Sequence, residues 1–325
     1  MGLIFVTRHI PEDGITLLKD AGHIVEVSEK DGVLTHAELI ERLHEKPYDA
    51  VLCLLNDRID AEVFRAVPTA KIFANYAVGY DNINVKDAHD AGVTVTNTPG
   101  VLTDTVAEYT IALMLSVAKR IPEADVFTRS GKYTGWAPEF LLGVDLKGKK
   151  LGILGAGRIG LEVAKRAHHG LGMSIMYYDT TKNALFEHEC DAVYADTIDT
   201  VFNEADVVSV HVPLTTETTH LVDARRLALM KPSAILINTS RGPVVDEKAL
   251  ASALMSHAIR GAGIDVFEFE PRIVEELTTL PQIVMTPHIA SASEETRSAM
   301  SRIAAQNIID FLVGKNPQNC VNVPL

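Results

Sequence analysis

The hydrophobic positions of the chain form short β-branched runs, and stretches with a helical period of apolar residues lie between them. This alternation is typical of parallel sheets covered by helices, so the pattern predicts an α/β protein. Each run is short enough to be a buried strand. Five strands are expected in the first hundred residues, at Leu3–Thr7, Ile24–Val27, Ala50–Leu55, Lys71–Ala74 and Val93–Thr96.

A second series of strands is expected beyond a break at Pro99–Gly100. The break precedes a long apolar helix from Thr103 to about Lys119, and an irregular segment with the only tryptophan, Trp136, follows. A last helix is expected over 291–314. Six parallel strands suit a doubly wound sheet, and the pattern places them at Leu151–Leu154, Ser174–Asp179, Val207–Val212, Ala234–Asn238, Gly261–Asp265 and Ile283–Thr286.

Length and charge narrow the classes of function. A chain of 325 residues favours two domains. Thirty Lys and Arg against 43 Asp and Glu give a net charge of −13, which argues against nucleic acid and anionic membranes as partners. No apolar run approaches the roughly 18 residues that span a bilayer. The three cysteines lie far apart without a Cys-x-x-Cys pair, so we expect no metal site and a cytoplasmic location.

A glycine-rich turn is the clearest single motif. Gly155, Gly157 and Gly160 form Gly-x-Gly-x-x-Gly where an apolar strand gives way to a helix. The first glycine permits the tight turn, the second lets the backbone approach a pyrophosphate, and the third allows close packing of helix on strand. We therefore expect this turn, with Arg158 and Ile159, to bind a dinucleotide.

The next predicted strand ends at Asp179, nineteen residues beyond Gly160. An acidic side chain at this position accepts hydrogen bonds from the adenosine ribose hydroxyls. It would also repel a 2′-phosphate, so NAD(H) is favoured and NADP(H) is the second candidate. Lys182 weakens this preference without reversing it.

Three charged residues follow three further strand ends. They are Arg241, Glu270 and His288, and the carboxyl ends of parallel strands are where ligands of doubly wound sheets bind. Reduction of a keto acid needs a cation for the carboxylate and carbonyl, a group that titrates near neutrality and a partner that tunes it. A carboxylate beside an imidazolium favours the charged form and so makes a proton available.

Seven motifs lie in order along nearly the whole chain. They are NYAVGYDNI (75–83), VTNTPGVLTDTVAE (95–108), GILGAGRIG (152–160), HVPLTTET (211–218), INTSRGPVVDE (237–247), GAGIDVFEFEP (261–271) and TPHIASA (286–292). Together they resemble the D-isomer-specific 2-hydroxyacid dehydrogenases, a family that includes glyoxylate/hydroxypyruvate reductases and phosphoglycerate dehydrogenase. The resemblance implies that Arg241 clamps the substrate, that His288 is the acid–base and that Glu270 hydrogen-bonds the imidazole.

The resemblance also implies further binding residues. Backbone N–H groups of Val78 and Gly79 would bind the substrate carboxylate. It places four more residues at the cofactor, with the last facing the nicotinamide amide: Thr103, Pro213, Thr218 and Asp265.

For the whole chain, the resemblance implies a discontinuous flavodoxin-like substrate domain, residues 1–99 plus 290–325. It implies a Rossmann NAD-binding domain over 100–289, with the active cleft between the two. Patches around residues 51–60, 101–105 and 135–140 most resemble glyoxylate/hydroxypyruvate reductases.

By this resemblance, Leu55 of this chain would line the substrate side, and Trp136 would reach over the partner subunit's site. We therefore expect a homodimer, with the helix from Thr103 as its interface. The expected reaction is reduction of a small 2-keto acid, glyoxylate or hydroxypyruvate, to the D-2-hydroxy acid.

The sequence is also compatible with other functions. The chain could be a D-lactate- or phosphoglycerate-type dehydrogenase, or an NAD-sensing corepressor-like binding protein. Single residues have structural interpretations as well. Thr218 could close a helix cap, Asp265 could be a structural residue, and Trp136 could anchor an interface without touching substrate.

Overall fold

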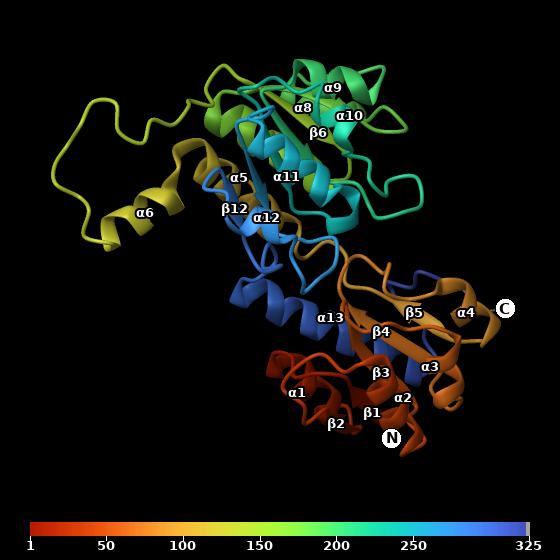
Figure 1. The fold of residues 1–325 in the computed structure, drawn as a ribbon. Helices are drawn as coiled ribbons and strands as arrows, with labels where there is room; N and C mark the ends of the chain where they lie inside the picture. Colours follow the sequence, from red (N-terminus) through yellow and green to blue (C-terminus); the bar gives the residue numbers. More distant parts are fainter. Residues whose placement is uncertain (323–325) are drawn as a thin grey trace. The chain divides into compact units, whose positions relative to one another are not determined.

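The structure is a computed structural model that describes residues 1–322. It contains two compact units (Figure 1). Unit 1 comprises Met1–Leu102 together with the chain from Ala292 onward, and unit 2 comprises Thr103–Ser291. Each unit is built on its own parallel sheet, which confirms the predicted α/β class.

Unit 1 holds a five-stranded parallel sheet in the order β2-β1-β3-β4-β5. This order is the flavodoxin-like one, in which the chain reverses direction across the sheet once. The strands agree with the predicted ones to within two residues at each end. They are β1 (Leu3–Val6), β2 (Ile24–Val27), β3 (Ala50–Leu54), β4 (Ile72–Tyr76) and β5 (Thr94–Thr96).

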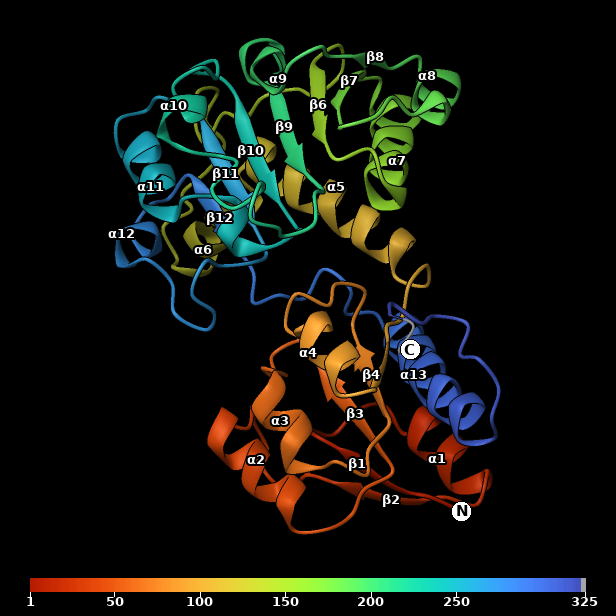
Figure 2. The same ribbon diagram turned by 90° about the vertical axis from the view of Figure 1, so that its right-hand side faces the viewer.

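Helices cover both faces of this sheet (Figure 2). One layer holds α2 (His36–His44), α3 (Ala61–Ala66) and α4 (Val85–Asp90), whose apolar side chains share a core with the strands. The other layer holds α1 (Glu12–Asp20) and α13 (Glu294–Leu312), the predicted last helix with its ends trimmed by two or three residues. Unit 1 is thus completed by the end of the chain.

The contact between α1 and α13 is close enough to involve backbone. Gly14 N donates to Ser301 Oγ at 2.9 Å, and Ser301 Oγ donates to the carbonyl oxygen of Pro11 at 2.6 Å. A Cβ atom at position 14 would lie 2.3 Å from Ser301 Oγ and 2.4 Å from its carbonyl oxygen. These hydrogen bonds hold α13 against α1, and the backbones approach so closely that position 14 must be a glycine.

Unit 2 holds a seven-stranded parallel sheet in the order β12-β11-β10-β9-β6-β7-β8. The pattern predicts six of these strands and misses β8, which has only two residues and lies at the edge. The strands are β6 (Lys150–Leu154), β7 (Ser174–Tyr178), β8 (Val193–Tyr194), β9 (Val207–Val210), β10 (Ile235–Asn238), β11 (Gly261–Ile264) and β12 (Ile283–Met285).

Two apolar clusters, one on each face, hold the helices of unit 2 to its sheet (Figure 2). The first face carries α5 (Thr103–Lys119), which matches its predicted bounds, with α7 (Arg158–Lys165) and α8 (Ala184–Cys190). The second face carries the helical segments whose apolar side chains belong to the other cluster. They are α9 (Ile198–Glu204), α10 (Ala224–Leu227), the 3-10 turn Gly242–Val244, α11 (Glu247–Met255) and α12 (Glu275–Thr278).

One helix of unit 2 has no buried residue. It is α6 (Ile121–Arg129), which follows α5 and which the hydrophobic pattern does not predict. Figure 1 shows α6 and the irregular segment after it extending away from the sheet of this unit. Phe127 and Phe140 contact each other here, with ring centroids 4.7 Å apart.

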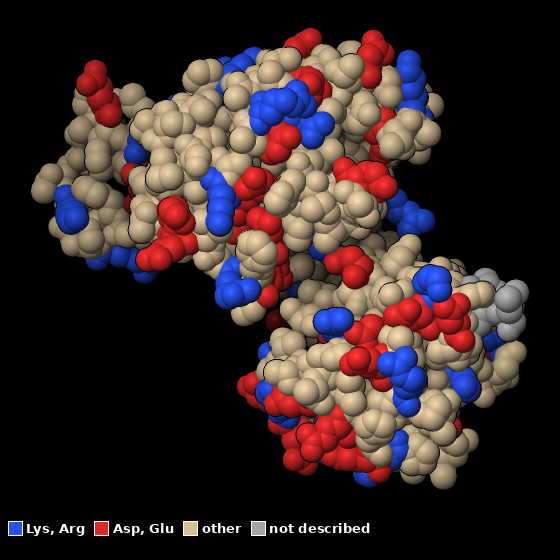
Figure 3. Space-filling model, turned by 45° about the vertical axis from the view of Figure 1, so that its right-hand side comes forward, with Lys and Arg blue, Asp and Glu red and all other residues tan. Residues whose placement is uncertain are grey.

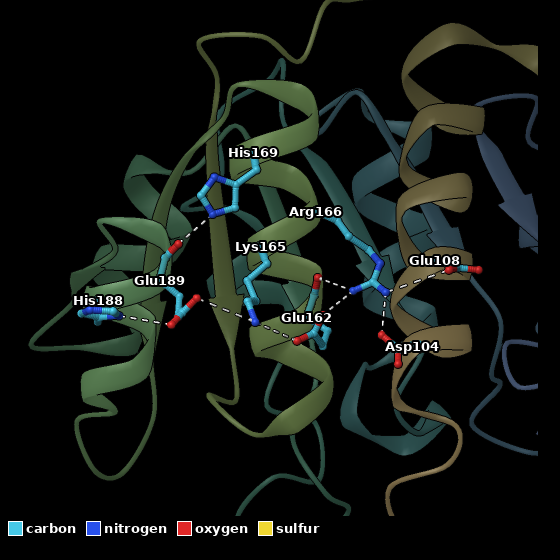
Figure 4. A network of polar contacts seen from close by, with 8 residues as sticks. All are labelled: Asp104, Glu108, Glu162, Lys165, Arg166, His169, His188 and Glu189. Carbon is cyan, nitrogen blue, oxygen red and sulfur yellow. Dashed lines mark hydrogen bonds and ion pairs between the residues drawn. The ribbon is translucent and has the colours of Figure 1, made fainter.

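A polar network ties α5, α7 and α8 together (Figure 4). Arg166, in the π-helical turn Arg166–Gly170 after α7, pairs with Glu162 at 2.5 Å and with Asp104 of α5 at 2.6 Å. Lys165 bridges Glu162 to Glu189 of α8, at 3.2 and 3.9 Å. The network fixes the helix that begins at the glycine-rich turn.

Acidic and basic side chains are mixed on the face of the molecule that Figure 3 draws. Among residues 1–322 no helix is both long and apolar enough to cross a membrane.

We predict that Gly14→Ala destabilises unit 1. The added methyl group must push Ser301 away from the first helix, and overpacking of this kind costs about 1–3 kcal/mol. Urea denaturation followed by circular dichroism measures the change. Gly170→Ala is the control, because a Cβ there meets nothing within 4 Å; equal stability losses in both variants would contradict the prediction.

Candidate active site

Because all strands of unit 2 run parallel, the loops after their carboxyl ends leave the same edge of the sheet. This edge carries most of the predicted site. The glycine-rich turn follows β6, Asp179 follows β7, Arg241 follows β10, Asp265 and Glu270 follow β11, and His288 follows β12.

The glycine-rich turn has the geometry that a dinucleotide needs. Gly155 has a φ of +99°, and a Cβ there would lie 2.7 Å from the carbonyl carbon of His211, after β9. A Cβ on Gly160 would lie 2.3 Å from the carbonyl oxygen of Gly155, so the helix packs directly on the turn. Gly157 caps α7 and has open space around its Cα. Backbone N–H groups at the start of α7, with Arg158 and Ile159, suit a pyrophosphate.

Asp179 is fixed against this turn. Its Oδ2 accepts a hydrogen bond from Ala156 N at 2.6 Å, and its Oδ1 accepts from Thr180 N at 2.6 Å. The Asn183 side chain donates to the carbonyl oxygen of Ala156 at 2.8 Å. The Lys182 ammonium lies over the Tyr194 ring, 5.0 Å from its centroid. An acidic group therefore lies beside the glycine-rich turn.

Glu270 and His288 are in direct contact. His288 Nδ1 lies 3.0 Å from Glu270 Oε2, and Glu270 Oε1 accepts from Phe267 N at 3.0 Å. Both side chains are about three-quarters buried, with 23% and 24% of their surface exposed.

Burial acts to raise the pKa of Glu270, but the hydrogen bond and charge of His288, aided by Arg241, hold it below its ordinary value of 4.5. The carboxylate is thus ionised at neutral pH. The stability it contributes is present above the ordinary glutamate pKa and is lost as the pH falls through the lowered value.

The loop that carries His288 is organised by Asp265. His288 has a φ of +56°, and its N–H donates to the carbonyl oxygen of Asp265 at 2.8 Å. The buried Asp265 carboxylate accepts from Ile289 N, Ala290 N and Thr286 Oγ1 at 2.9, 2.7 and 2.6 Å. Burial raises the pKa of Asp265. These contacts are structural; contact with the nicotinamide stays a prediction.

Arg241 belongs to a short loop that packs on the Glu270 loop. Asn238 Nδ2 donates to the carbonyl oxygen of Arg241 at 2.9 Å, and the guanidinium donates to that of Ser240 at 2.9 Å. The neighbouring Gly242 lies so close to Phe267 that a Cβ would be 1.9 Å from its carbonyl carbon. Backbone contact therefore places the arginine loop beside the loop of Glu270.

Two more predicted residues close the turn after β9. Thr218 Oγ1 donates to the carbonyl oxygen of Pro213 at 2.6 Å and accepts from Thr215 N at 2.8 Å.

Two further residues lie outside this turn. Thr103 is the first residue of α5. His211, which the sequence leaves outside the catalytic set, contacts Ser209 Oγ through Nε2 at 2.8 Å, and burial lowers its pKa to about 3.

The predicted substrate residues Leu55, Val78 and Gly79 lie in unit 1. Leu55 follows β3, and the other two follow β4. Asn97 Nδ2 donates to the carbonyl oxygen of Val78 at 2.8 Å, and Asn75 Nδ2 donates to that of Gly79 at 2.9 Å, so this loop has a fixed backbone.

Trp136 lies in the segment after α6 and is 84% exposed. Within residues 1–322 no group of three or more His, Cys, Asp or Glu side chains is arranged to hold a metal ion.

Sequence reasoning misses two acidic residues beside the pair. Glu247, at the start of α11, is 2% exposed, and Glu268 contacts both it and His220. Acidic residues in a first helical turn usually face solvent, where they complement the helix dipole. The sequence therefore carries no signal that Glu247 is buried.

Known proteins resemble this chain over nearly its whole length. Residues 111–290 match the NAD-binding domain of the D-isomer specific 2-hydroxyacid dehydrogenases. A glyoxylate reductase of Thermococcus litoralis is 48% identical over 98% of this chain and 96% of its own length. One from Pyrococcus furiosus is 46% identical over 98% and 95%.

Solved structures match over both units as well. A Thermus thermophilus protein, 41% identical, superimposes with a TM-score of 0.92 over 98% of this chain and all of its own. The NADPH-dependent glyoxylate/hydroxypyruvate reductase of Sinorhizobium meliloti, 32% identical, has a TM-score of 0.86 over 99% and 98%. The chain therefore belongs to the D-isomer specific 2-hydroxyacid dehydrogenase family, as its motifs predict, and is an NAD(P)-dependent oxidoreductase.

Proposed function

We propose that this protein reduces glyoxylate or hydroxypyruvate to the D-2-hydroxy acid. The observation that carries the proposal is the 3.0 Å contact of Glu270 with His288, beside the Arg241 loop and on the sheet edge that holds the glycine-rich turn. Relatives named glyoxylate reductase, 45–48% identical over nearly the full chain, support the choice of substrate.

The chemistry divides between the cofactor and three side chains. A bound nicotinamide cofactor supplies the hydride for the carbonyl carbon. Arg241 holds the substrate carboxylate and polarises the carbonyl by its charge. His288, whose Nδ1 is held by Glu270, delivers a proton from Nε2 to the carbonyl oxygen, and the ionised Glu270 stabilises the imidazolium before transfer.

In unit 1 the backbone N–H groups of Val78 and Gly79 bind the substrate carboxylate, and Leu55 supplies an apolar wall. Two contacts support this role, because a carbonyl shares its peptide group with the N–H of the following residue. Thr98 N donates to the carbonyl oxygen of Ala77 at 2.9 Å and so orients the Val78 N–H. Asn97 Nδ2 donates to the carbonyl oxygen of Val78 and so orients the Gly79 N–H. A small apolar wall suits a keto acid of two or three carbons.

For the cofactor, NADH is preferred over NADPH. Asp179, fixed beside the glycine-rich turn, repels a 2′-phosphate and accepts from the ribose hydroxyls. Thr103, Pro213, Thr218 and Asp265 complete the cofactor site.

The active form is a homodimer. Its interface lies on α6 and the segment after it instead of on the predicted α5, because apolar side chains of α5 are buried within unit 2: Ala107, Leu113, Met114 and Val117. Unit 2 exposes apolar side chains on α6 and the segment after it, and a second copy of this chain would cover them: Ile121, Val126, Tyr133, Trp136, Phe140 and Leu142. Trp136 then reaches the partner subunit's site. The three free cysteines support a cytoplasmic location.

We predict that His288→Asn lowers kcat for glyoxylate and hydroxypyruvate by about 10²–10⁴-fold, because the proton donor is lost. Asparagine tolerates the positive φ of this position. Oxidation of NADH is followed by absorbance, with pyruvate and phosphohydroxypyruvate as further substrates. His257→Asn is the control, because His257 is exposed and has the same φ of 56°. Near-normal turnover in His288→Asn would refute the assignment.

We predict that Asp179→Ala narrows the preference for NADH over NADPH by roughly tenfold, equivalent to about 1.4 kcal/mol, because the charge that repels the 2′-phosphate is removed. Dissociation constants of both cofactors, from the fluorescence of the bound nicotinamide, measure the ratio. Asp196→Ala, an exposed aspartate of the same unit, is the control. An unchanged ratio in Asp179→Ala would remove this residue from the cofactor site.

We predict that the protein elutes with about twice the 35.4 kDa mass of one chain in size-exclusion chromatography with light scattering. Val126→Glu, which places a charge on the exposed α6, shifts it towards the monomer because a buried unpaired charge is costly. Val193→Glu, at an exposed valine of β8, leaves the mass unchanged. A monomeric wild-type protein would contradict the proposed dimer.

A further inference from the structure

The buried Glu247 makes contacts that the proposed reaction does not use. It opens α11, immediately after the Arg241 loop, and its side chain faces the interior. Its Oε1 accepts from Glu268 N, and its Oε2 accepts from Val274 N at 3.3 Å. One carboxylate thus holds both ends of segment 268–274, which contains Glu270.

The attachment is reciprocal at its first end. Glu268 Oε2 accepts from Glu247 N at 3.3 Å, while Glu268 Oε1 lies 2.7 Å from His220 Nε2. The backbone N–H of His220 donates to the carbonyl oxygen of Pro243 at 2.8 Å. Segment 268–274 is therefore tied to α11, to the turn after β9 and to the Arg241 loop.

Burial of the Glu247 carboxylate costs free energy, because its charged form loses contact with water. Burial raises the pKa of Glu247, and the nearby charges of Glu268 and Glu270 raise it further, while the two backbone N–H groups act against them. A buried carboxylate is tolerated where hydrogen bonds satisfy it. The hydrogen bonds here are made to the backbone of one particular loop.

We propose that Glu247 is a positioning residue that fixes segment 268–274 so that the Glu270 carboxylate meets His288 Nδ1. The proposal rests on the proposed function, in which Glu270 and His288 are the acid–base pair. Six titratable or charged groups face this segment or belong to it, besides Glu247 itself: Glu268, Glu270, Arg272, His220, His288 and Arg241.

Glu247→Gln tests the proposal. A glutamine amide has one acceptor oxygen, so one of the two backbone N–H groups loses its partner and meets an N–H donor instead. We expect kcat to fall roughly ten- to a hundredfold, as for small displacements of reacting groups. The alkaline limb of the kcat–pH profile should move to lower pH, because a loosened Glu270 stabilises the imidazolium less. The dissociation constant of NADH should stay within about twofold.

A second variant removes the donor instead of the acceptor. Val274 has a φ of −59°, which proline adopts, so Val274→Pro deletes the N–H without changing the backbone angle. We expect the same direction of change in kcat and in the pH profile. Glu276→Gln, an exposed glutamate of α12, is the matched control and should resemble the wild type.

The outcomes separate the two proposals. Unchanged kcat and pH profile in Glu247→Gln and Val274→Pro, with Glu270→Gln impaired, would overturn the role of Glu247 and leave the proposed function intact. A loss of kcat without a shifted pH profile would also overturn it, since a merely structural role predicts that result. Full activity in Glu270→Gln and His288→Asn would refute the proposed function itself. If Glu247→Gln does not bind NADH, Val274→Pro decides.

Discussion

Parallel pairing of all seven strands in unit 2 is the constraint on which its chemistry depends. Parallel strands send every following loop to the same edge, whatever the distance along the chain. The pairing of β6 with β9 brings the glycine-rich turn against His211, and the run β10-β11-β12 brings three loops side by side. Arg241 and His288, which are 47 positions apart in sequence, therefore belong to loops separated by a single loop, the one after β11 that carries Glu270.

Backbone N–H groups stabilise several carboxylates at this edge. Asp179, Asp265, Glu247 and Glu270 each accept at least one hydrogen bond from the backbone. Such donors cost no side-chain entropy and are fixed before a ligand arrives. The site therefore holds its negative charges in defined positions.

The sequence predicts the elements that have a long or strongly apolar signal. Eleven strands and the helix Thr103–Lys119 follow directly from their hydrophobic runs, and strand ends locate Arg241, Glu270 and His288. It misses β8, because two residues are too few for a periodic pattern, and α6, because a helix without a buried face has no such pattern. Glu247 could not be found, since its burial results from how loops 241–247 and 267–274 pack together.

The contact of Gly242 with Phe267 bears on how substrate range could be redesigned. The loops after β10 and β11 touch through their main chains at this contact. Replacing only one of them with the loop of a relative would therefore bring together two backbones that do not fit. Recombination of such enzymes would succeed only with crossover points outside the stretch from β10 to β12. New specificities would then come more readily from side chains of unit 1 than from loop replacement in unit 2.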